Sequence, residues 1–159
     1  MTGAGAVRGF TLTELVTVIV MIGILAVVAL PRFDAAQEFA ATGFRDRVAA
    51  SLRFAQKSAV AKRRMVCATV TSATLTLTSA AGFGDADCAN AMVGPDGSNP
   101  AASSPRASIT VSAAPAGPLY FQPSGQVTSD AAGTTAANFT LAVTGQTAIT
   151  VHGATGYVN

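Results

Sequence analysis

The chain has 159 residues, of which 50% are hydrophobic and only 11% charged, and its mean hydropathy is +0.44. Soluble domains carry about a quarter charged residues, and disordered chains are less hydrophobic and more charged, so the composition departs from the first class and excludes the second. The net charge of +2 indicates no partner by itself, yet nine of the ten basic residues lie within residues 1–64, so the chain joins two different kinds of sequence.

The N-terminal part contains a long apolar segment. Phe10–Leu30 comprises 21 residues whose only charge is Glu14, and it has no polar stripe of the kind found on a core helix of a soluble protein. As a helix these residues would span about 32 Å, which is enough to cross a hydrocarbon layer of roughly 30 Å. The segment therefore predicts either a membrane helix or an export signal.

Glu14 distinguishes between the forms that this segment could take. A cleavable secretory signal would use Arg8 as its basic start and Val27–Ala29 as its cleavage site. A carboxylate at the edge of the apolar run benefits neither such a signal nor a plain membrane anchor, because an acid at that depth is costly and usually marks a function.

The residues around Glu14 resemble a known family. Residues 8–33, which begin Arg-Gly-Phe-Thr-Leu-Thr-Glu-Leu, resemble the N-terminus of type IV pilins and type II secretion pseudopilins. The resemblance implies that a prepilin peptidase cleaves between Gly9 and Phe10 and then methylates the new N-terminus of Phe10. It also implies a single-pass protein of the bacterial inner membrane with a periplasmic C-terminal domain. Such a protein joins other major and minor pilins or pseudopilins in a filament through an inner-membrane assembly platform.

The physical chemistry of Glu14 agrees with this role. A carboxylate in an apolar phase needs an opposite charge, and the resemblance implies that the α-amino group of Phe10 on a neighbouring subunit provides it after cleavage. Glu14 would then set the axial register during assembly. The alternative is that Thr11 and Glu14 only form a capping box that starts the helix.

After Pro31, which should kink the helix, the periodicity predicts an amphipathic helix to about residue 63. Its apolar face consists of Phe33, Phe44, Val48, Leu52, Ala55 and Ala59. Arg53, Lys57 and Arg64 fall close together on the opposite face and are candidate DNA phosphate contacts. The alternative is a solvated face, with Lys62–Arg64 placed favourably against the helix dipole. We favour this alternative because no aromatic side chains interleave with the cations.

From Met65 onward the apolar residues alternate, which predicts β-strands. The expected strands are Met65–Val70, Ala73–Ser79, Ala107–Ser112, Leu119–Gln122, Asn138–Val143 and Ala148–His152. The first two form a hairpin, and residues 144–147 form a turn between the last two. Residues 94–105 and 113–118 are expected to be irregular loops. The predicted fold class is α+β, with a long N-terminal transmembrane and amphipathic helix packed on a small antiparallel sheet or sandwich.

Cys67 and Cys88 are the two cysteines of the chain. An exported protein with an even number of cysteines favours a disulfide between them, which would stabilise the fold by roughly 3 kcal/mol. The alternative is two separate buried thiols.

Several later segments resemble the GspH/FimT group of minor pilins and pseudopilins. They are Ala55–Arg63, Phe121–Gly125 and Val151–Val158, and residues 63–67 also resemble the MshC minor pilins of mannose-sensitive haemagglutinin pili. FimT-like DNA-uptake proteins carry basic residues in the C-terminal segment. Residues 153–159 contain none, with Tyr157 where that group often has Arg, so the chain departs from the DNA-binding pattern.

The sequence offers no motif for catalysis, a metal or a cofactor. His152 is the sole histidine and has no nucleophile motif beside it, so we expect no catalytic residue. Asp85, Asp87 and Asp96 hint at a calcium loop, but the positions around them do not match an EF-hand, so we expect no metal site and no cofactor.

The predicted organisation is a leader (1–9), a transmembrane and filament-core helix (10–30), an amphipathic extension (31–64) and a periplasmic β domain (65–159). The predicted function is a minor pilin or pseudopilin, not an enzyme, that helps to initiate or cap a type IV pilus or type II secretion pseudopilus. The alternatives are a DNA-binding minor pilin acting in DNA uptake and a secreted β domain released by a signal peptidase near Leu30.

Overall fold

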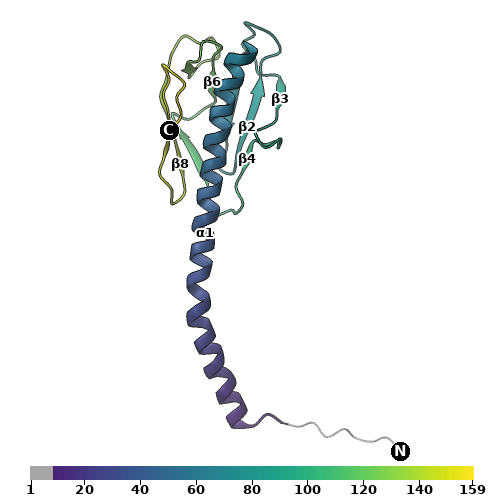
Figure 1. The fold of residues 1–159 in the computed structure, drawn as a ribbon, viewed down its shortest axis with the longest axis vertical. Helices are drawn as coiled ribbons and strands as arrows, with labels where there is room; N and C mark the ends of the chain where they lie inside the picture. Colours follow the sequence, from purple (N-terminus) through teal and green to yellow (C-terminus); the bar gives the residue numbers. More distant parts are fainter. Residues whose placement is uncertain (1–8) are drawn as a thin grey trace, which may run out of the picture. The chain divides into compact units, whose positions relative to one another are not determined.

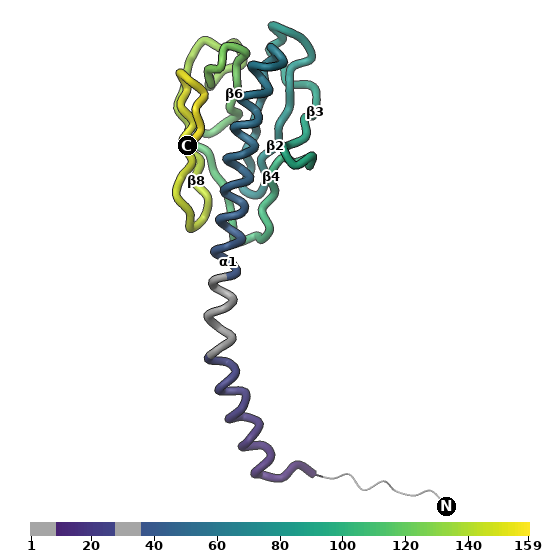
Figure 2. Tube along the Cα trace, viewed as in Figure 1, coloured from purple at the N-terminus to yellow at the C-terminus, as the bar shows by residue number. Residues whose placement is uncertain are grey.

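The computed structural model describes the backbone of residues 9–159 and the side chains of residues 9–27 and 36–159 (Figure 2). The chain divides into two compact units, Met1–Gln37 and Glu38–Asn159, which are considered separately below. Most of the predicted leader lies outside the described residues. The side chain of Phe33, on the predicted apolar face, and the expected kink at Pro31 lie outside them as well.

The long helix α1 runs from Leu12 to Lys62 and contains 51 residues. Between Leu12 and Val27 its large apolar side chains are exposed on every side, with Leu12 79% and Ile19 58% exposed. Among the described residues, no helix combines the length and apolar character needed to cross a membrane. The side chains of residues 28–30, which complete the predicted span 10–30, lie outside the described set, and the span stays a prediction.

In the second unit, α1 buries the predicted apolar face. Phe44, Val48 and Leu52 have no exposed surface, and neither do the two alanines one and two turns further on. Burying a side chain of this size stabilises the fold by about 1.5–3 kcal/mol. Ser51 lies within the same face, and its buried hydroxyl donates a hydrogen bond to the carbonyl of Ala101 (3.1 Å). The periodicity of this part of the helix is therefore confirmed.

Two antiparallel sheets pack with the helix in this unit. The larger contains β1 (Val66–Val70), β2 (Thr74–Ser79), β3 (Asn90–Met92), β4 (Ala102–Ser103), β6 (Leu119–Phe121) and β7 (Val127–Thr128). Its order is β3-β2-β1-β6-β7, and β4 also pairs with β2. The smaller sheet has the order β5-β8-β9, from β5 (Val111–Ala114), β8 (Phe139–Val143) and β9 (Ile149–Val151).

The larger sheet extends to both sides of the helix axis in projection, with β6 on the side of β8 (Figure 1). In Figure 1, β2, β3 and β4 appear on one side of α1, and β8 with the C-terminus on the other. Alternate residues of β8, namely Phe139, Leu141 and Val143, point into a core shared with the helix and with Leu75 and Leu77 of β2. This arrangement confirms the predicted α+β fold class.

Both predicted turns between neighbouring strands are present. The β1–β2 hairpin pairs Val66 with Ser79, and in its turn the Thr71 hydroxyl accepts a hydrogen bond from the N–H of Thr74 (3.0 Å). The turn between β8 and β9 has Gly145 at a φ of 71°, a conformation that glycine adopts without strain.

Other predicted strand boundaries were wrong. The strand expected at Ala107–Ser112 lies at Val111–Ala114, because residues 106–109 form a turn in which the N–H of Ile109 donates to the carbonyl of Arg106. The expected loop at 113–118 therefore begins later, and the loop at 94–105 contains β4. Strands β3 and β7 were missed because two or three residues are too short to show alternation.

Candidate functional site

The predicted processing site lies just ahead of the helix. Gly9 and Phe10 are exposed and outside regular structure, and Phe10 is 76% exposed. Helix α1 starts two residues later, at Leu12. The Gly9–Phe10 peptide bond is therefore not protected by helical hydrogen bonds or by packing among the described residues.

Glu14 lies in the first turn of α1. Its backbone N–H donates to the Thr11 hydroxyl (3.3 Å) and to the Thr11 carbonyl (3.1 Å), so Thr11 caps the helix. A full capping box also needs the Glu14 carboxylate to accept from the Thr11 N–H, and no such hydrogen bond is present among the described residues. Half of the capping box is thus formed among the described residues, and the Glu14 carboxylate takes no part in it.

The surroundings of Glu14 carry no other charge among the described residues. It is the sole charged residue between Leu12 and Val27, and no basic group of the described residues lies within 4 Å of its carboxylate. A helix that exposes apolar side chains on every side is stable only when something covers it. This part of α1 therefore presents a surface for packing, with one carboxylate in it.

The predicted disulfide between Cys67 and Cys88 is confirmed. The two Cα atoms are 6.1 Å apart. Cys67 is buried in β1, and Cys88 lies two residues before β3, so the bridge ties the loop between β2 and β3 to the middle of the larger sheet. That loop carries Phe83, which is 79% exposed.

The three candidate DNA-binding cations do not form one helix face. Arg53 is exposed, but its Nε donates a hydrogen bond to the carbonyl of Val158 near the C-terminus (3.1 Å). Lys57 is exposed one turn later on the helix. Arg64 lies beyond the end of α1, where a helical projection no longer applies.

The helix ends in a Schellman motif, which explains the placement of Arg64. The N–H of Arg63 donates to the carbonyl of Val60 (3.3 Å), and the N–H of Arg64 donates to the carbonyl of Ala59 (3.2 Å). Arg63 has a φ of 51°, the left-handed conformation that this motif requires and that glycine usually supplies. The chain therefore reverses at Arg63, and neighbouring cations leave the helix in different directions.

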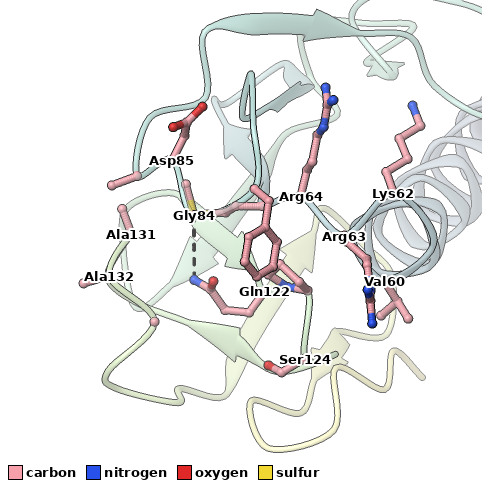
Figure 3. Close-up of a pocket in the computed structure, with 15 residues that line it drawn as sticks. Val60, Lys62, Arg63, Arg64, Gly84, Asp85, Gln122, Ser124, Ala131 and Ala132 are labelled. Carbon is pink, nitrogen blue, oxygen red and sulfur yellow. Dashed lines mark hydrogen bonds between the residues drawn. The ribbon is translucent and has the colours of Figure 1, made fainter.

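An open groove of about 1060 Å³ lies beside this reversal. Figure 3 shows Lys62 and Arg64 extending to one side and Arg63 to the other. The lining also includes apolar side chains from the end of α1, from the residue before β1 and from three loops: Val60, Met65, Phe83, Ala86, Pro123, Ala131 and Ala132. Sequence reasoning missed the groove because its parts are far apart in the chain. The one available signal was a phenylalanine between two glycines at positions 82–84.

A second set of polar side chains on α1 fastens the C-terminal part of the chain. Thr42 donates to the Gln146 side chain (3.2 Å), and Arg45 Nε donates to the carbonyl of Thr147 (2.8 Å). Gln56 donates to the carbonyl of Thr155 (3.0 Å), next to the bond that Arg53 makes. These contacts hold the β8–β9 hairpin and the final segment against the helix. The polar residues of this helix face therefore stabilise the fold.

The remaining candidates are isolated from one another. His152 is exposed just after β9, with its ring centroid 5.9 Å from that of Tyr157. The Asp96 carboxylate accepts from the hydroxyl (2.6 Å) and the N–H (3.1 Å) of Ser98, and these bonds hold the pKa of Asp96 below its ordinary value. Among the described residues, no group of three or more His, Cys, Asp or Glu side chains is placed to hold a metal ion.

Comparison with known families decides the relationship of this chain. The model of the family described as "Type II transport protein GspH" matches residues 45–156, more than two thirds of the sequence. The chain belongs to the GspH family. No curated protein matches the sequence. A solved structure with a similar fold is that of the type IV minor pilin FimU of Pseudomonas aeruginosa strain PAO1. It is 18% identical, with a TM-score of 0.52 over 80% of this chain and 90% of FimU.

The GspH match confirms the resemblance to pilins and pseudopilins. Members of this superfamily are structural subunits that associate with one another in a pilus or pseudopilus, and the GspH match makes the chain a member. The matched range contains the last part of α1 from Arg45, both sheets, the disulfide and the groove. It does not include Gly9, Phe10 or Glu14, whose roles are considered next.

Proposed function

We propose that this GspH-family chain is a prepilin that helps to initiate or cap a filament. A prepilin peptidase cleaves it between Gly9 and Phe10 and methylates the new amino group of Phe10. Before assembly, residues 10–30 anchor it in the bacterial inner membrane, with residues 65–159 in the periplasm. The assembly platform then transfers it to the filament, where the same helix packs among those of other pilins or pseudopilins.

The observation that supports this proposal is the exposed carboxylate of Glu14, which has no charged partner among the described residues and is the one charge of the helix between Leu12 and Val27. A lone carboxylate costs about 2.5–3.5 kcal/mol at the centre of a bilayer on insertion scales, and less toward the edge, where Glu14 lies. A positive charge in hydrogen-bonding distance offsets this cost. Cleavage after Gly9 creates such a charge at Phe10, and a neighbouring subunit can present it to Glu14 as the helices pack.

The test compares three variants at the start of α1 in cells that assemble the filament. Glu14→Ala and the isosteric Glu14→Gln should be cleaved and methylated normally but should be largely lost from sheared filaments. Thr11→Ala removes the helix cap and retains the carboxylate, so it should be incorporated like the wild type. If both Glu14 variants enter filaments at the wild-type level, the charge-pairing proposal is wrong.

The alternative of a DNA-binding minor pilin would use Arg53, Lys57 and Arg64. We favour the assembly role because Arg53 already bonds the C-terminal segment and Arg64 lies beyond the end of α1. The decisive comparison is a DNA mobility shift with the full chain in detergent at low salt. A shift that is lost when all three residues are changed to alanine would support DNA uptake instead.

A further inference from the structure

The groove beside the end of α1 has an excess of positive charge. Its lining contains the three consecutive cations Lys62–Arg64, all exposed, and, of the described residues, one acid, Asp85. Among the described residues, the three cationic side chains make no hydrogen bond and lie within 4 Å of no carboxylate. Arg45 and Arg53, in contrast, each donate to a backbone carbonyl of the C-terminal part of the chain. The cations of the groove are therefore available to a negatively charged partner.

The same groove exposes apolar side chains to solvent. Phe83 is 79% exposed and Val60 is 46% exposed, although both are large hydrophobic residues. Interface cores are enriched in aromatic residues, Met and Arg, and this lining has all three. Its volume of about 1060 Å³ lies at the upper end of the range of about 300–1,000 Å³ for ligand pockets, so a short peptide segment fits. The surface thus favours a partner that is both acidic and apolar.

The walls of the groove are held in place by contacts within the chain. The loop of Phe83 is fastened at one end by the N–H of Ala80, which donates to the carbonyl of Met65 (2.9 Å), and at the other end by the disulfide. The side-chain nitrogen of Gln122 lies 3.7 Å from the Met65 sulfur, a contact that Figure 3 draws as a dashed line. A preformed site of this kind loses less conformational entropy when a partner binds.

We propose that the groove binds an extended acidic segment of a different protein subunit, whose carboxylates pair with the cations while an apolar side chain packs on Phe83. Lys62 and Arg64 extend to one side and Arg63 to the other (Figure 3). Successive side chains of an extended segment point to opposite sides, so two neighbouring carboxylates reach cations on both sides. Each arginine offers two parallel N–H donors to a carboxylate. That the partner is another pilin or pseudopilin of the filament rests on the proposed function.

The acids of this chain do not form such a segment for a second copy. Within residues 38–159, three acids already bind groups of their own chain, namely Asp46, Asp96 and Asp130. Asp85 and Asp87 lie in the loop that forms the groove, so a second copy would bring its own cations with them, and like charges oppose such a contact. Glu38 is a single carboxylate for three cations. A different partner also agrees with a subunit that starts or caps a filament and does not repeat along it.

The test measures how a dye-labelled peptide binds the full chain in detergent, by fluorescence anisotropy. The probe is Asp-Glu-Phe-Asp-Glu, blocked at both ends, and the control peptide is Asn-Gln-Phe-Asn-Gln, which has the same shape without the charges. The acidic peptide should bind about tenfold more tightly, as expected for several exposed ion pairs together. Equal affinity for the two peptides, or no binding of the acidic one, overturns the proposal.

Variants of the full chain locate the binding site. Arg64→Gln should lower the affinity for the acidic peptide about two- to fivefold, as expected for losing an exposed ion pair. Phe83→Ala, which changes an exposed side chain, should lower it about two- to tenfold through the lost ring contact. Lys57→Gln is the matched control and should have no effect, because Lys57 is an exposed cation of α1 outside the groove. Equal losses for Lys57→Gln and Arg64→Gln would show a general charge attraction and overturn the site.

Two further measurements identify the kind of partner. A single-stranded oligonucleotide with the same net charge as the acidic peptide should bind more weakly than the peptide. Tighter binding of the oligonucleotide overturns the proposal in favour of a nucleic acid. In cells that assemble the filament, a photoreactive residue in place of Ala132, exposed in the lining, should cross-link to an acidic segment of another subunit. A cross-link to a second copy of this chain, or none to another subunit, overturns the proposal as well.

The peptide measurement needs no filament, so its result is separate from that of the proposed function. If the Glu14 variants enter filaments normally while the acidic peptide binds, the proposed function is wrong and the groove remains a site for acidic segments. If the Glu14 variants are lost from filaments while the two peptides bind equally, the proposed function stands and the groove proposal is wrong.

Discussion

Changing Arg53 to alanine tests whether this cation is a structural residue or a free surface charge. In the structure its Nε donates to the carbonyl of Val158, within the segment that closes the smaller sheet at the C-terminus. Lys57 is the matched control, because it is exposed one turn later on the same helix and makes no side-chain hydrogen bond among the described residues.

The size of the effect follows from the contact. A hydrogen bond from a charged group contributes about 1.5–3 kcal/mol, but Arg53 is exposed to solvent, which lowers our expectation to about 1 kcal/mol. Exposed changes without such contacts stay within about 0.5 kcal/mol, so Lys57→Ala should be nearly neutral. With a urea m-value of about 1.5 kcal/mol/M, Arg53→Ala should lower the unfolding midpoint by about 0.7 M.

The assay is urea unfolding of residues 38–159, which contain all the buried hydrophobic residues described, combined with amide hydrogen exchange. Exchange should accelerate at the C-terminal residues of Arg53→Ala and remain unchanged for Lys57→Ala. Gln56→Ala removes the neighbouring bond to Thr155 and should accelerate the same amides. Equal midpoints for Arg53→Ala and Lys57→Ala, with unaltered C-terminal exchange, would refute the structural role.

Four further changes have defined outcomes in the same fragment. Arg63→Gly should raise the free energy of unfolding by about 1 kcal/mol in urea titrations, because Arg63 has a φ of 51°. Gly156→Ala should lower the thermal midpoint and cost more than about 2 kcal/mol, since its φ is 67° and an added Cβ would strike a backbone carbonyl. Replacing both Cys67 and Cys88 by alanine should cost about 3 kcal/mol in urea, and reduction of the wild type should match it. Two backbone N–H groups hold the pKa of Asp130 below its ordinary value. The contribution of Asp130 to the free energy of unfolding is therefore present above about pH 4 and lost as the pH falls further. Asp130→Asn should flatten the pH dependence of the free energy of unfolding below about pH 4.

Local patterns in the sequence were sufficient for the features that depend on neighbouring residues. The apolar period of 3.6 residues placed Phe44, Val48 and Leu52 in the core, because one helix face packs on the sheets. The alternation in β2 and β8 was read correctly for the same reason. The disulfide followed from the export signal and the even cysteine count, and the fold class followed from the order of helix and strands.

Features that depend on distant segments could not be predicted. Strand β7 has only two residues, and its partners lie on either side of it in the tertiary structure. The helical projection grouped Arg64 with Arg53 because nothing in the sequence marked the end of the helix before Arg64. The Schellman reversal needs a residue in the left-handed conformation at position 63, and an arginine does not indicate that conformation. The groove likewise needs the helix end and the loop of Phe83 to meet, which no local pattern encodes.

The central claim, that this chain is processed as a prepilin, is tested most directly by the N-terminus of the native protein. Intact-mass measurement and N-terminal peptide analysis should find a chain that begins at Phe10 and carries one methyl group on its α-amino nitrogen. A mature N-terminus near Leu30 would instead show that residues 10–30 are a cleaved secretory signal, and it would contradict the account.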